Sequence, residues 1–103
     1  MHDSKKLEEQ IIQSYQEQEE MMILIFAQWC INEGVDPYEL YKEAYPQQGA
    51  NEKLAGVMKL TVPKDEAGPI EDDTVLGALS IFGNEDLAFA VTNVIANRKA
   101  SKR

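Results

Sequence analysis

The chain has 103 residues, of which 44% are apolar and 27% charged, and its net charge at pH 7 is −8. This length predicts one domain with a core of ordinary size, and the composition excludes an intrinsically disordered chain. The negative charge opposes nonspecific binding to nucleic acids and to anionic membranes. We expect a single helical domain over residues 1–103, with frayed ends at 1–6 and 99–103.

A first helix is predicted from Ser4 to Glu33, because Gly34 follows it as a C-terminal stop signal. Residues 21–31 of this helix read MMILIFAQWCI, in which Gln28 alone is polar. A helix that is apolar on every side must be surrounded by protein, and this run is too short to cross a bilayer, which takes ~20 apolar residues. The apolar C-terminal half of the helix is therefore expected to form the central core of an all-α fold.

The first half of the same helix is amphipathic and should extend beyond the domain. Thirty helical residues span ~45 Å, whereas a compact chain of about 100 residues is roughly 35 Å across. The overhanging polar end either frays or packs on a partner, and we predict a homodimer with these helices near a two-fold axis. The candidate self-association residues are Leu7, Ile11, Tyr15 and Met22.

A second helix is predicted to begin at Pro37, with Asp36 as its N-cap, and to end before Pro46. Three tyrosines recur on it at positions i, i+3 and i+7, and they are Tyr38, Tyr41 and Tyr45. Tyrosine combines apolar area with a polar tip, so this stripe is a candidate partner-binding surface. Alternatively, it is the seam on which the second helix packs against the first, with the hydroxyls reaching water.

A third helix should follow Asn51 as its N-cap and end near Leu60. Residues 61–73 then contain two prolines, one glycine and five acids, which predicts a long acidic loop of a kind that is often functional. The candidate interaction residues in this segment are Asp65, Glu66 and Glu71. Their spacing does not fit a calcium-binding loop, so no metal site is predicted.

Two further helices complete the predicted fold of about five. Asp72 or Asp73 is expected to cap a fourth helix that ends at Gly83, and Asn84 to cap a fifth. Apolar residues recur at helical spacing in both segments, at positions 75, 76, 79 and 82 and at 87, 91, 94 and 95. No segment reads convincingly as a strand.

The residue types that usually carry catalysis are scarce. His2 is the only histidine and Cys30 the only cysteine, and Cys30 lies in the apolar run, where burial should raise the pKa of its thiol. Neither a Gly-rich phosphate loop nor a nucleophile elbow occurs, so no catalytic residue or cofactor is predicted. A buried free thiol and the lack of a visible secretory signal or membrane-spanning segment suggest the cytoplasm.

The sequence is therefore interpreted as a small cytosolic, non-catalytic protein that binds or regulates an unidentified protein and associates with itself. The alternative is a nucleic-acid-related role. That role is either weak binding through the basic tail (Arg98, Lys99, Lys102 and Arg103) or inhibition of a DNA-binding partner by an acidic protein. Direct binding is not favoured, because the last helix begins with Glu85 and Asp86, which would repel phosphates. A carboxylate- or metal-dependent enzyme is a third and weaker hypothesis.

Overall fold

The computed structural model describes residues 2–48 and 52–101, and the side chains of these residues except those at positions 2–6, 8, 11, 12 and 99–101. This part of the chain is all-helical and contains no strand, which confirms the predicted fold class. Its five helices are α1 (His2–Glu33), α2 (Pro37–Ala44), α3 (Glu52–Met58), α4 (Asp72–Ile81) and α5 (Glu85–Ser101). The backbone is thus helical over most of the segments expected to fray, while positions 1, 102 and 103 lie outside the described residues.

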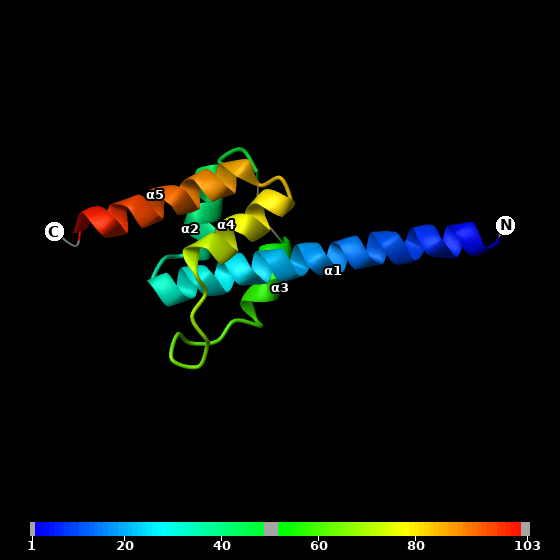
Figure 1. Cartoon of the computed structure of the whole chain (residues 1–103), viewed down its shortest axis with the longest axis horizontal. Coiled ribbons are helices and arrows are strands. Elements are labelled where there is room, and N and C mark those ends of the chain that lie inside the picture. The colour runs from blue at the N-terminus through cyan, green and yellow to red at the C-terminus, as the bar shows by residue number, and fades with distance from the viewer. Residues whose placement is uncertain (1, 49–51, 102–103) are drawn as a thin grey trace.

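Helix α1 lies along the whole molecule. Its C-terminal half packs against α2, α3 and α4, and α5 packs in turn on α2 and α4, whereas its N-terminal half projects away from the other helices (Figure 1). The molecule measures 63 × 32 × 24 Å, so the predicted overhang is confirmed. We call residues 2–20 the arm and the other described residues the body. Every side chain described in the arm is exposed except that of Glu19, which is half-buried.

The core forms around residues 22–30 of α1. Phe26, Trp29 and Cys30 are fully buried there, with Trp29 at 0% exposure. The other helices cover them with buried apolar residues, which are Leu40, Leu54, Val57, Val75, Leu79, Leu87, Ala90 and Val91. The apolar run is thus the central core helix, as predicted. Met21, the first residue of the run, is an exception at 63% exposure.

Local sequence signals set the helix ends, but the predicted cap of the fourth helix is wrong. Gly34 has a φ of +73°, and hydrogen bonds from its own N–H to Ile31 and from Val35 to Cys30 complete a Schellman motif. Helix α4, however, is capped by neither Asp72 nor Asp73. It begins after Glu71, whose side chain makes no capping hydrogen bond, and both aspartates lie in the first turn. Asn51, the expected cap of α3, lies outside the described residues.

Replacing Trp29 by alanine should destabilise the fold strongly. The change Trp29→Ala removes a fully buried ring and its hydrogen bond to Asp72, so we expect a loss of about 3–5 kcal/mol in the free energy of unfolding. Urea denaturation followed by circular dichroism measures this value. The matched control is Met21→Ala on the same helix, which should change stability by less than about 0.5 kcal/mol because Met21 is exposed. Equal effects of the two changes would contradict the placement of the core.

Candidate functional site

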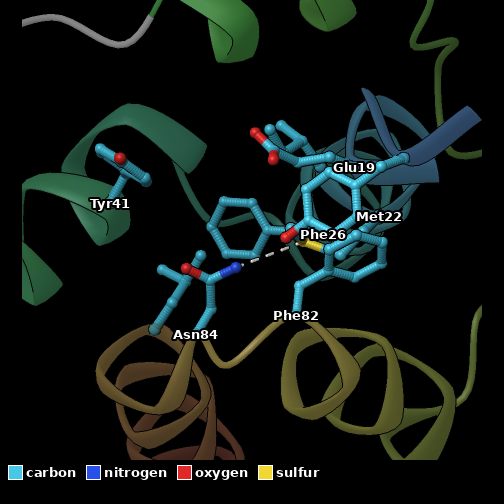
Figure 2. Close-up of a pocket in the computed structure, with 9 residues that line it drawn as sticks. Glu19, Met22, Phe26, Tyr41, Phe82 and Asn84 are labelled. Carbon is cyan, nitrogen blue, oxygen red and sulfur yellow. Dashed lines mark hydrogen bonds between the residues drawn. The ribbon is translucent and has the colours of Figure 1, made fainter. Parts of the chain in front are cut away.

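A pocket of about 160 Å³ opens where the arm leaves the body. Helices α1 and α2 and the corner between α4 and α5 form its walls, and their side chains point into it from three directions (Figure 2). The lining residues are Tyr15, Glu19, Met22, Ile23, Phe26, Tyr41, Phe82, Asn84 and Leu87. Most of these residues are apolar or aromatic, but the surface that they expose in the pocket is more polar than apolar.

The polar groups of the pocket are fixed by hydrogen bonds within the protein. The Tyr45 hydroxyl donates to Asn84 Oδ1 at 3.0 Å, and Asn84 Nδ2 donates to the Met22 sulfur at 3.9 Å. The Tyr41 hydroxyl donates to Gln48 Oε1 at 2.9 Å. Burial, followed by the negative charge of Asp86, raises the pKa of Tyr45. This hydroxyl therefore remains a neutral donor at neutral pH.

Two contacts hold the arm where it joins the body. The ring of Tyr15 lies 5.5 Å from that of Phe82, centroid to centroid, at an interplanar angle of 57°. Glu19 forms an ion pair with Lys53 of α3, and the hydrogen bond between them raises the pKa of Lys53. The base of the arm is thus held by contacts with α3 and with the corner between α4 and α5.

The tyrosine stripe is divided between the interior and the surface. The rings of Tyr41 and Tyr45 are half-buried and lie 5.1 Å apart, and both hydroxyls are bonded to side chains of the protein. Tyr38 is exposed. Helix α2 packs more extensively on α5 than on α1, so the seam that was expected against the first helix lies mainly against the last.

The segment between α3 and α4 is attached to α1 by two buried amide side chains. Gln28 Nε2 donates to the Val62 carbonyl at 2.9 Å, and Gln28 Oε1 accepts from the Val62 N–H at 2.9 Å. Asn32 accepts from Gln28 at 3.0 Å and donates to the Gly68 carbonyl at 3.4 Å. The attachment of the loop by Gln28 and Asn32 was not predicted from the sequence. The available signal was an amide pair four residues apart in an otherwise apolar stretch.

An ionic cluster joins the ends of α1, α4 and α5. Arg98 lies between Asp72, at 2.6 Å, and Glu33. The other oxygen of Asp72 accepts from Trp29 Nε1 at 3.1 Å. Asp72 is therefore occupied by long-range partners, which explains why it does not serve as the helix cap. The charge of Arg98 is neutralised within the fold.

The acids of the loop lie on the surface. Asp65, Glu66 and Glu71 are all exposed, and the first two belong to a turn closed by hydrogen bonds to the Pro63 carbonyl. Among the described residues, no three or more histidine, cysteine, aspartate or glutamate side chains come together in a group that could hold a metal ion.

The candidate self-association residues fall into different environments. Leu7 and Tyr15 are exposed, at 56% and 54%. Met22 is only 3% exposed, because it faces Asn84 and the core, and so it does not belong to the surface of the arm as the sequence suggested. The side chain of Ile11 lies outside the described residues.

Cys30 is a buried free thiol. Burial and then the charge of Asp36 raise its pKa from 9.0 to about 12. The thiol therefore stays protonated at neutral pH, which disfavours a role as a nucleophile.

These features define a small all-helical protein with a buried central helix that continues as an exposed arm. The model of the YxiS family matches residues 3–96, and the chain belongs to this family. The uncharacterized protein YxiS of Bacillus subtilis (strain 168) is 53% identical over 93 residues, which cover 89% of this chain and 97% of that protein. No solved structure matches the chain. Within the described residues, no helix combines the length and apolarity needed to cross a membrane.

Replacing Gln28 by alanine should release the loop from α1. The change Gln28→Ala removes both hydrogen bonds to Val62, so we expect a loss of about 1–2 kcal/mol in stability and faster hydrogen exchange over residues 59–71. Hydrogen-exchange mass spectrometry and tryptic cleavage at Lys64 measure the release. Gln16→Ala, at an exposed position of the same helix, should leave both unchanged. Unaltered protection of the loop in Gln28→Ala would show that the amide pair does not hold it.

Proposed function

We propose that this chain is a small cytoplasmic, non-catalytic protein that acts by binding other proteins and associates with itself. The observation that carries this proposal is the arm, which projects from the body as an exposed helix (Figure 1). Helices in proteins gain most of their stability from the packing of an apolar face and less from intrinsic helix propensity. An exposed helical arm is therefore best explained by a surface on which it packs. The free buried Cys30 fits the reducing conditions of the cytoplasm.

The surface of the arm supports the same interpretation. Leu7 and Tyr15 are two large apolar side chains that lie mostly in water, on a helix that is otherwise rich in glutamate and glutamine. Single exposed apolar residues are common, but Leu7 and Tyr15 are at i, i+8 spacing, which falls within one amphipathic stripe and suits contact with another helix. Self-association through this stripe requires no rearrangement of the body.

A charge placed in this stripe should disrupt self-association. We expect the parent chain to sediment as a dimer and Leu7→Glu to weaken the association at least ~10-fold, because the carboxylate would be buried without a partner. Analytical ultracentrifugation over a wide concentration range measures the mass. Gln16→Glu adds the same charge about half a turn from Leu7 around the helix and should have little effect. A monomeric parent chain at all concentrations would exclude self-association.

The acidic loop is a second candidate surface, for a different protein. Asp65, Glu66 and Glu71 are exposed, and the bonds from Gln28 and Asn32 hold the backbone around them. A fixed group of carboxylates is complementary to a basic surface and speeds the encounter with it. Tyr38 is also exposed and available for contact. We therefore propose a partner with a basic binding face.

Reversing the charge of the loop should weaken capture of such a partner. The combined changes Asp65→Lys, Glu66→Lys and Glu71→Lys should lower the amount of protein retained from cell extract, most clearly at low salt. The control carries the same change in net charge at exposed acids elsewhere, through Glu39→Lys, Glu43→Lys and Glu85→Lys. If the two triple variants retain equal amounts of the same protein, the loop is not the binding surface.

Direct binding to nucleic acid, the alternative, has less support. Arg98, the first residue of the basic tail, is paired with Asp72 and Glu33, so it is not free to contact a phosphate. The net charge of −8 also opposes association with a polyanion.

A further inference from the structure

We propose that two copies of the chain pair arm to arm in an antiparallel arrangement, so that Leu7 of each copy packs at the mouth of the pocket at the root of the partner's arm. This inference rests on the self-association proposed above. It adds the relative orientation of the two chains and the residue that covers each pocket. Each pocket is then closed by a residue of the other chain.

The pocket and the stripe of the arm lie on the same side of α1. Tyr15, Glu19, Met22 and Phe26 line the pocket at intervals of four, three and four residues, which places them along one face of the helix. Leu7 lies eight residues before Tyr15 and is turned about 80° from it around the helix, so it falls at the edge of the same broad stripe. A second helix laid along the exposed stripe therefore approaches the pocket, where Phe82 lies beside α1 and Tyr41 lies on the other side, on α2 (Figure 2).

Two-fold symmetry then determines the orientation. In a symmetric pair, any contact from Leu7 to the partner's Tyr15 is repeated from Tyr15 to the partner's Leu7. Both contacts form at once only if the two helices are antiparallel and cross midway between these positions. This pairing covers the two most exposed apolar side chains described in the arm, at 56% and 54% exposure, in one step.

The charges of the arm favour the same orientation. In the antiparallel register, Glu17, Glu19 and Glu20 of the two chains lie at opposite ends of the paired arms. A parallel register would instead place Glu17, Glu19 and Glu20 of both chains side by side, and like charges at that distance repel. The antiparallel register therefore separates like charges that a parallel register would bring together.

The size of the contact explains why the pocket is needed. Two helical arms of ~28 Å, packed along one side, bury on the order of 800 Å² in total, whereas stable interfaces bury ~1,200–2,000 Å². Contact between Leu7 of each arm and the wall of the pocket beside Tyr15, where Phe82 lies, adds area at both ends of the pair. We infer that the pocket supplies the part of the interface that the arms alone lack.

Heterotypic disulfide cross-linking tests this arrangement. The variants Leu7→Cys and Tyr15→Cys are prepared in a Cys30→Ala chain, mixed, oxidised and examined on a non-reducing gel. The mixture should form at least ~5-fold more cross-linked dimer than either variant alone, because two copies of position 7 lie ~12 Å apart along the pair. The same variants in the chain that retains Cys30, which is buried, provide a second test if Cys30→Ala impairs folding.

The possible outcomes are distinct. Cross-linking of each variant with itself would indicate parallel arms and overturn the inference. A dimeric mass without the heterotypic cross-link would also overturn it, since the two arms would then not pair in this register, while self-association itself would stand. A monomeric mass of the parent chain would overturn both this inference and the proposed self-association.

Discussion

The fold depends on the enclosure of residues 22–30 of α1 by the four shorter helices. Phe26, Trp29 and Cys30 expose almost no surface to the solvent, and each of the other helices contributes buried apolar residues to the same core. Because apolar burial is the main favourable term in folding, the short helices α2 and α3 are held by this contact more than by their intrinsic helicity. The same constraint leaves the arm outside, since the body covers only the second half of α1.

Much of the architecture follows from local sequence signals. The apolar run predicts the central helix because its side chains recur on every side, and Gly34 and Asp36 mark helix ends through backbone geometry that depends on a few neighbouring residues. Asp72 shows where such reasoning fails. An aspartate at the start of a helix is usually a cap, but this one bonds to Trp29 and Arg98, which are distant in the sequence.

The candidate site was predicted only in part, because it also depends on contacts between residues that are distant in the sequence. The apolar stripe of the arm is visible from its spacing, and Leu7 and Tyr15 are exposed in it. Met22 has the same spacing but is buried, because the corner at Asn84 closes over it. The position of that corner is set by packing between helices. The periodic pattern of one segment does not reveal how that segment packs on another. The pocket itself is likewise assembled from α1, α2 and the α4–α5 corner.

The link between Gln28 and the loop has a consequence for how the chain can vary. Gln28 bonds to the main-chain N–H and C=O of residue 62 and not to its side chain. Any residue except proline offers the same two atoms, so the attachment survives almost any substitution at that position. The surface chemistry of the loop can therefore diverge among relatives while its position on the helix is retained. Gln28 is the residue that must be kept for this attachment.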